Sequence, residues 1–218
     1  QDNVLTRKEL GDFTKWVLEF GRINGCNMSY NRKDLFDAKI DVQFDKVGTP
    51  LFNIKSESVS DSKISRIISK IAKVFLEKIE HLQSRKTDKD LWLNLGVMNH
   101  ELKKGDVRTL SWHRDYVHEG KTVVIDYFDY IMLLPLTDSE TQNQGWKGGR
   151  LILAHDNSSR FDHIPPQKIN KNMITTEYGA NEAVVFDNMK VIHTINKIEA
   201  MRSSNRVILI LRSRSKKK

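Results

Sequence analysis

The sequence contains very little cysteine and no long hydrophobic run. Its one cysteine, Cys26, cannot form a disulfide or a thiolate metal cluster within the chain, and it favours a reducing compartment. No apolar run approaches the roughly 20 residues that span a bilayer. The first apolar residues are interleaved with Arg7, Lys8 and Glu9, which does not fit the pattern of a signal peptide. We therefore expect an intracellular, cytoplasmic protein without a membrane segment.

The composition is typical of one soluble globular domain with a basic charge. Hydrophobic residues make up 39% and charged residues 29% of the 218 residues, which is enough for one domain with a hydrophobic core. The formal net charge is +8. A basic C-terminal cluster could bind nucleic acid or another anionic surface, but a solvated, frayed end is the simpler interpretation. The cluster consists of Arg212, Arg214, Lys216, Lys217 and Lys218.

The first 90 residues predict two amphipathic helices and two short strands. Thr6 and Glu9 have the spacing of a capping box, and apolar residues follow them at helical spacing as far as Phe20. A second apolar stripe has lysine and arginine on its opposite face, as expected of a helix that lies against a sheet. The predicted elements are a helix from Thr6 to Gly21 or Gly25, strands at 38–44 and 51–54, and a helix from Ser60 or Asp61 to Leu82.

From Leu91 onward the hydrophobic period changes from helical to two, and no convincing helix follows. Several strands joined by loops predict an antiparallel sandwich or barrel. We expect a single domain over 1–218, with an N-terminal α/β buttress (1–90), a β core (91–212) and a basic tail (213–218). The predicted strands of the core are 91–98, 127–136, 150–154, 173–177, 183–186, 191–195 and 206–211.

A histidine and a carboxylate stand two residues apart at His113 and Asp115. On an extended segment such residues project to the same side, so both can reach one ion while Arg114 is turned away. His193 supplies another imidazole between apolar neighbours. Two histidines and one carboxylate on one face of an octahedron suit Fe(II) and leave three positions open for substrate and oxygen. The alternative is that these are ordinary buried polar residues.

The ordered set of motifs around these residues resembles the Fe(II)/2-oxoglutarate-dependent dioxygenase superfamily. The order is a metal pair, an apolar strand, a Gly-Gly strand start, a turn into a Val-Val-Phe strand, a distal histidine and an arginine. Asp115 and His193 are 78 residues apart (193 − 115 = 78), and His193 and Arg206 are 13 apart (206 − 193 = 13). The resemblance covers residues 91 to 212. The matching segments are 112–115, 130–136, 148–153, 179–187, 191–193 and 205–209.

This resemblance implies a mostly β fold, the double-stranded β-helix or jelly roll, with flanking helices. It implies that His113, Asp115 and His193 hold Fe(II) and that Arg206 pairs with the distal carboxylate of 2-oxoglutarate, for which a bidentate guanidinium is suited. Oxidative decarboxylation of 2-oxoglutarate to succinate and carbon dioxide would use O2 and would oxidise, usually hydroxylate, a substrate.

The sequence departs from the family pattern at two positions. Many members have serine two residues after the arginine, but this chain has Ile208, so a second hydrogen-bond donor to 2-oxoglutarate is unassigned. Arg150 follows the Gly-Gly pair where an acidic residue is common. Residues 1 to 90, which often help to shape the substrate pocket in such enzymes, match nothing that identifies a substrate.

Other residues near these motifs are candidates for the same roles. Arg202 and Arg212 are rivals of Arg206, but one precedes the strand and the other lies at its far end. We interpret Trp112 as packing beside the metal segment and Trp146 as a possible rim contact. The long loop 156–172 could form a lid. The histidines and neighbouring acids interpreted as loop residues are His100, Glu101, His118, His155, Asp156 and His163.

Three functions remain open at this point. The first is a 2-oxoglutarate-dependent oxygenase, a hydroxylase acting on a small molecule or a polypeptide side chain. The second applies the same chemistry to a nucleic acid, which the charge of +8 supports only weakly, because no aromatic cluster accompanies the basic residues. The third is a jelly-roll binding module without turnover, which the complete set of four site residues disfavours.

Overall fold

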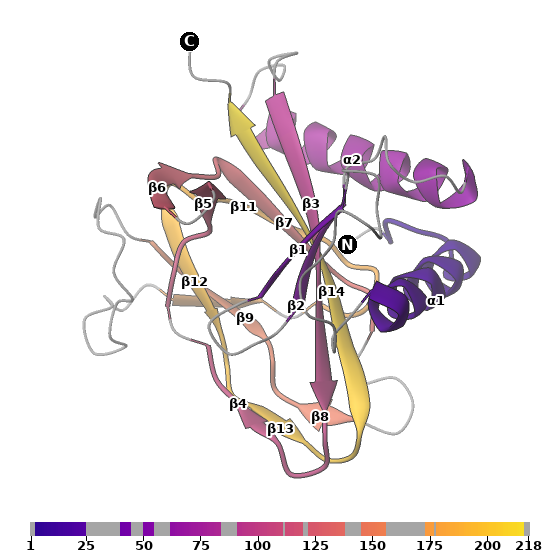
Figure 1. The fold of residues 1–218 in the computed structure, drawn as a ribbon. Coiled ribbons are helices and arrows are strands. Elements are labelled where there is room, and N and C mark those ends of the chain that lie inside the picture. Colours follow the sequence, from indigo (N-terminus) through magenta and orange to yellow (C-terminus); the bar gives the residue numbers. More distant parts are fainter. Residues whose placement is uncertain are drawn as a thin grey trace.

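In the computed structural model, the described residues form fourteen strands, and two helices precede most of them near the N-terminus (Figure 1). The residues that the structure describes are 3–24, 40–44, 50–54, 62–83, 91–110, 112–119, 122–137, 145–155, 173–176 and 178–215. The helices are α1 (Arg7–Asn24) and α2 (Ser62–Gln83). The strands are β1 (Ile40–Phe44), β2 (Pro50–Ile54), β3 (Leu91–Leu102), β4 (Val107–Arg108), β5 (Tyr116–Glu119), β6 (Thr122–Tyr127), β7 (Tyr130–Pro135), β8 (Trp146–Lys147), β9 (Leu151–His155), β10 (Met173–Thr176), β11 (Val184–Asp187), β12 (Val191–Ile195), β13 (Ile198–Ala200) and β14 (Ser204–Ser215).

A six-stranded antiparallel sheet is the largest sheet among the described residues, with the order β1-β2-β3-β14-β7-β11. Its two longest strands, β3 and β14, pair from Leu91 opposite Ser215 to Leu102 opposite Ser204. On its other edge, β14 pairs with β7, which in turn pairs with β11. β14 is therefore an interior strand of this sheet, and it continues past residue 212, where the predicted core ends.

The side chains of β14 alternate between the two faces of the large sheet, as the period of a strand requires. Val207, Leu209 and Leu211 belong to a buried cluster that includes Phe13 of α1 and Ile71 of α2. Figure 1 shows both helices on this side of the sheet. The apolar stripes predicted for the helices thus face a sheet. Burial of these stripes against the sheet stabilises the helices far more than their intrinsic helix propensity does.

The opposite face of the large sheet is covered by a second antiparallel sheet with the order β10-β9-β12. Ile208 and Ile210 of β14 share a buried cluster with Leu151 of β9 and with Phe186 of β11. An isolated bridge between His113 and His193 adds the 112–113 segment to the β12 edge. The described residues therefore have a mostly β architecture of antiparallel sheets, and the metal-pair motif lies at the edge of the second one.

The predicted capping box is confirmed at the start of α1. The backbone N–H of Thr6 donates to Glu9 Oε2 at 2.8 Å, and the N–H of Glu9 donates to Thr6 Oγ1 at 3.2 Å. Lys70 of α2 also donates to Glu9 Oε2, at 2.7 Å. The hydrogen bonds from Lys70 and from the Thr6 backbone lower the pKa of Glu9 to about 2. One carboxylate thus both caps α1 and links the two helices.

We expect Thr6→Ala to lower the free energy of unfolding by about 1 kcal/mol, the usual cost of losing a capping side chain.

The contribution of Glu9 to stability should depend on pH, because its pKa is about 2 in the folded chain and 4.5 ordinarily. A lowered pKa means that this contribution is complete above the ordinary pKa and is lost as the pH falls toward the folded value. Urea unfolding of the wild type and Glu9→Gln should differ at neutral pH and converge in acid; a constant difference would contradict this assignment.

Three predictions about loops are wrong. His155, interpreted as a loop residue, is the last residue of β9, where it pairs with Val191 of β12. His100 and Glu101 lie inside β3, where they pair with Arg206 and Asn205 of β14. The strand is longer than its apolar pattern indicated, because its long partner provides hydrogen-bonding groups as far as Leu102. His118, interpreted as a loop residue, lies in β5, which forms a hairpin with β6.

Short strands account for most of the other differences from the predicted elements. β4, β8 and β13 form a small sheet of two- and three-residue strands, too short for a period of two to be recognised. The two N-terminal strands extend the large sheet, since β2 pairs with β3. The division of the chain at residue 90 into an N-terminal part and a β core stays a prediction. The possible lid 156–172, with Asp156 and His163, lies outside the described residues. Neither described helix is both long and apolar enough to cross a membrane.

Candidate metal centre

A backbone pair brings His113 and His193 together. They are 80 residues apart in the sequence (193 − 113 = 80), yet each donates its N–H to the other's carbonyl oxygen, at 3.0 and 2.9 Å. Directly opposed residues of an antiparallel pair project their side chains to the same face. The two imidazole rings accordingly lie with their centroids 4.2 Å apart.

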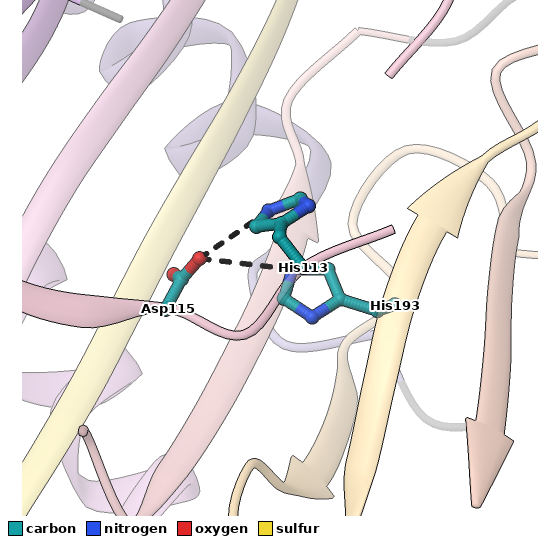
Figure 2. Close-up of side chains that lie close together, drawn as sticks. All are labelled: His113, Asp115 and His193. Carbon is teal, nitrogen blue, oxygen red and sulfur yellow. Dashed lines mark ion pairs between the residues drawn. The ribbon is translucent and has the colours of Figure 1, made fainter. Parts of the chain in front are cut away.

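Asp115 completes this cluster, as Figure 2 shows. Its Oδ1 atom lies 3.5 Å from His113 Nε2 and 3.7 Å from His193 Nε2. The exposed fraction of the side chain falls from 23% at His113 to 13% at Asp115 and 6% at His193. The cluster is therefore closed at His193 and most accessible at His113. The three side chains thus lie together in the structure, as the sequence predicts.

Asn188, which the sequence did not single out, holds the backbone of Asp115 on both sides. The N–H of Asp115 donates to Asn188 Oδ1 at 3.2 Å, and Asn188 Nδ2 donates to the Asp115 carbonyl at 2.9 Å. The same Nδ2 atom donates to the Phe128 carbonyl at 2.8 Å, and Asn188 is fully buried. Asn188 follows β11 in a turn, where asparagine is common, so its sequence context gave no sign of a buried role.

The second carboxylate oxygen of Asp115 is bound to an arginine. Arg212 Nε donates to Asp115 Oδ2 at 2.7 Å, across 97 residues of sequence. The Arg212 guanidinium also lies 5.4 Å from the centroid of the Phe128 ring, in a cation–π arrangement. The prediction that Arg212 belongs to a solvated, frayed basic end is wrong, because it lies within β14 with a side chain only 12% exposed. Its position beside the metal-pair aspartate was not predicted.

The charges of the cluster favour the forms that bind a metal ion. Burial alone would raise the pKa of Asp115, but the Arg212 guanidinium and His113 together hold it well below its ordinary value. Burial, aided by His113, lowers the pKa of His193 to about 3. At neutral pH Asp115 is therefore ionised and His193 is neutral, and these are the protonation states that a metal ion requires.

The donor set fits a divalent transition metal. One donor atom from each of His113, Asp115 and His193 lies within 4.8 Å of the others. Neighbouring ligands of an octahedral ion with bonds of about 2.1 Å lie about 3 Å apart, so small side-chain rotations would bring these atoms onto one ion. His193 Nδ1 has no hydrogen-bond partner among the described residues. Its ring is instead positioned by Phe186, at a centroid distance of 5.0 Å.

Arg206 lies on the same face of β14 as Arg212, six residues earlier (212 − 206 = 6), and it contacts the Gly-Gly turn. Its side chain is buried, with 4% of the residue exposed, and Nη2 donates to the Gly149 carbonyl at 3.0 Å. Gly149 has a φ of 79°, and a Cβ added there would lie 3.1 Å from Arg206 Nε. A glycine is therefore required both by the backbone conformation and by the close approach of the guanidinium.

The hydroxyl of Tyr178 is buried beside Arg206 and has no hydrogen-bond partner among the described residues. Burial raises the pKa of Tyr178, and the nearby Arg206 guanidinium opposes this with a smaller effect. Buried hydroxyls are normally hydrogen-bonded. A guanidinium and a hydroxyl that lie close enough to influence each other's pKa could both donate to one carboxylate. Tyr178 belongs to none of the motifs, so the sequence did not single it out.

The other candidate residues are either packed in the core or exposed. Trp112 shares a buried cluster with Ala154 and Ile192, as predicted. Trp146 is buried against Leu102 and Ile198 rather than on a rim. Three further residues near the motifs are exposed, namely Arg150, His155 and Arg202.

No family model matches the sequence, and no curated protein matches it. The structure is similar to that of a Pseudomonas putida prolyl-4-hydroxylase, with a TM-score of 0.57, 13% identity, and coverage of 100% of this chain and 91% of that one. For AviO1 from Streptomyces viridochromogenes the TM-score is 0.53, the identity 12% and the coverage 98% and 87%. For SnoN, a non-heme alpha-ketoglutarate-dependent epimerase from nogalamycin biosynthesis, the values are 0.52, 14%, 98% and 76%. The chain therefore shares its fold with a prolyl-4-hydroxylase and with a non-heme alpha-ketoglutarate-dependent epimerase.

Proposed function

We propose that this protein is an Fe(II)- and 2-oxoglutarate-dependent dioxygenase. The observation that supports this most directly is the convergence of His113, Asp115 and His193, whose donor atoms lie within 4.8 Å of one another. Two imidazoles and one carboxylate on one side of the ion are the ligand set of non-haem Fe(II) oxygenases, which leaves three positions open. Iron bound there would supply the activation of O2.

Arg206 and Tyr178 are proposed to bind the distal carboxylate of 2-oxoglutarate. Arg206 is buried and offers a planar guanidinium, held by the Gly149 carbonyl. The Tyr178 hydroxyl, without a partner among the described residues, would replace the donor that is lost where Ile208 stands. This side chain would give the carboxylate a second hydrogen bond and satisfy a buried hydroxyl at the same time.

The substrate is proposed to be a polypeptide side chain or a small molecule that approaches from the side of His113. This histidine is the most exposed of the three, at 23%. A hydroxylation is the favoured reaction, since the fold is similar to that of a prolyl-4-hydroxylase. The nucleic-acid alternative has only the net charge of +8 in its favour, and the last three lysines lie outside the described residues.

We also propose that the two facing sheets form a double-stranded β-helix and that α1 and α2 support it from behind. The packing of helix residues against Val207, Leu209 and Leu211 supports this role for the helices. In such an arrangement the large sheet keeps a fixed shape on its helix side while its other face carries Arg206 and Arg212. The N-terminal helices would then help to keep Arg206 and Arg212 in place by supporting the sheet that carries them.

The test is an anaerobic titration of the purified protein with Fe(II) and then 2-oxoglutarate, followed by addition of O2. We expect saturable binding of both, a metal-to-2-oxoglutarate charge-transfer band, and slow formation of succinate even without a substrate. Iron binding without 2-oxoglutarate binding would indicate a different metalloenzyme on this fold. If no iron binds, the proposed function is wrong and a binding module without turnover becomes the better hypothesis.

A further inference from the structure

We infer that Arg212 is a positioning residue for the metal site, which holds one oxygen of Asp115 so that the other faces the two histidines. This inference rests on the proposed role of Asp115 as a metal ligand. It adds a residue whose own atoms do not bind the metal.

The two oxygens of Asp115 have different partners. Oδ2 accepts a hydrogen bond of 2.7 Å from Arg212 Nε, while Oδ1 lies 3.5 Å from His113 Nε2 and 3.7 Å from His193 Nε2. A free carboxylate can rotate about its Cβ–Cγ bond and exchange its oxygens or offer both of them to an ion. A charge-assisted hydrogen bond of this length opposes that rotation. Arg212 therefore favours binding through Oδ1 alone.

Arg212 is itself held in place, as a positioning residue must be. Its side chain is only 12% exposed and lies against the Phe128 ring at 5.4 Å. The Phe128 carbonyl accepts a hydrogen bond from Asn188, which also binds the backbone of Asp115 on both sides. Arg212, Phe128, Asn188 and Asp115 thus form a closed set of contacts that fixes both the backbone and the side chain of the aspartate.

The inference predicts that removal of Arg212 has different effects on metal affinity in the presence and in the absence of Asp115. With Asp115 present, removing Arg212 should weaken metal binding by about 10- to 100-fold, the usual cost of losing a residue that orients a ligand. With Asp115 absent, Arg212 can no longer orient this ligand, and its positive charge repels a cation bound nearby. Removing it should then leave metal affinity unchanged or improve it.

The experiment measures the affinity of the full chain for Fe(II) anaerobically, and for Zn²⁺ by calorimetry, without 2-oxoglutarate. The variants are Arg212→Met, Asp115→Ala and the double variant, because methionine keeps much of the apolar packing against Phe128. Arg202→Met is the control for loss of one positive charge, since Arg202 is exposed. Circular dichroism of each metal-free variant establishes that it is folded.

The expected result is weaker binding by Arg212→Met, unchanged binding by Arg202→Met, and a double variant that binds at least as well as Asp115→Ala. The d–d absorption of bound Co²⁺ should also change in Arg212→Met, because its carboxylate can offer both oxygens, and Arg212→Lys should restore it only partly. Undiminished affinity of folded Arg212→Met, or equal weakening in both backgrounds, would overturn the inference alone. A wild type that binds no Fe(II) would overturn the proposed function and the inference with it.

Discussion

Replacement of Asp115 by alanine should lower Fe(II) affinity by more than about 100-fold and reduce succinate formation to the background rate. Asp115 contributes the one anionic donor of the cluster, and its Oδ1 lies between the two histidine Nε2 atoms. Two neutral imidazoles would remain, and they cannot offset the charge of a divalent ion. Anaerobic titration with Fe(II) and a succinate assay measure the two effects on the same preparation.

A loss of folding must be separated from this loss of metal. Asp115→Ala leaves the partly buried Arg212 without its carboxylate, and breaking such a pair can cost a few kcal/mol of stability. Asp115→Asn is the matched variant, because the amide oxygen can still accept the Arg212 hydrogen bond but is a weaker metal ligand. Glu199→Ala removes an exposed carboxylate paired with Lys197 and should leave iron binding intact. Full iron affinity in a folded Asp115→Asn or Asp115→Ala variant would show that the ligand set is misassigned.

Replacement of Arg206 by alanine should raise the KM for 2-oxoglutarate by about 100-fold while the affinity for Fe(II) stays near that of the wild type. A buried, bidentate guanidinium contributes about 1.5–3 kcal/mol through hydrogen bonds to a charged group, which corresponds to about 10- to 100-fold in binding. Arg206→Lys keeps the charge but loses the planar fork, so its KM should fall between the two. Steady-state assays of succinate formation at varied 2-oxoglutarate give these constants; equal KM values would remove Arg206 from the site.

Gly149 allows the same site to be disturbed without changing a charge. Gly149→Ala should raise the KM for 2-oxoglutarate by about tenfold, because the new Cβ would lie 3.1 Å from Arg206 Nε and force the guanidinium to move. Gly105→Ala is the control, since Gly105 has a φ of 89° but no atom within 4 Å of an added Cβ. Both variants should lose about 1 kcal/mol of stability from the left-handed backbone, and only the first should change KM.

Much of the site could be predicted from the sequence because its central features are local or ordered along the chain. The two-residue spacing of His113 and Asp115 places them on one face of any extended segment. The alternation within β14 likewise places Arg206 and Arg212 on one face, with Ile208 between them. His193 followed from the order of the motifs, and the structure brings it opposite His113 through one pair of backbone hydrogen bonds.

The residues that support the site could not be predicted in this way. Arg212 and Asp115 are separated by 97 residues, and their contact depends on which end of β14 passes the metal pair. Asn188 looked like an ordinary turn residue, and only the tertiary structure turns its amide toward Asp115. β4, β8 and β13 were not predicted for the same reason. They are strands because of their pairing in the tertiary structure, which their short sequences do not indicate.

The alignment of β14 has a consequence for how this protein can vary. Because the side chains of a strand alternate, a shift of β14 by one residue would turn Arg206 and Arg212 toward the helices and would turn Val207 away from them, toward the second sheet. The alignment is fixed by twelve paired positions with β3, from Ser204 to Ser215. A single insertion or deletion near Leu209 would therefore reverse the faces of β14 on one side of it, so that Arg206 and Arg212 would point to opposite faces of the sheet. We therefore expect β14 to accept substitutions more readily than changes of length, which its surface loops can accommodate at a lower cost in stability.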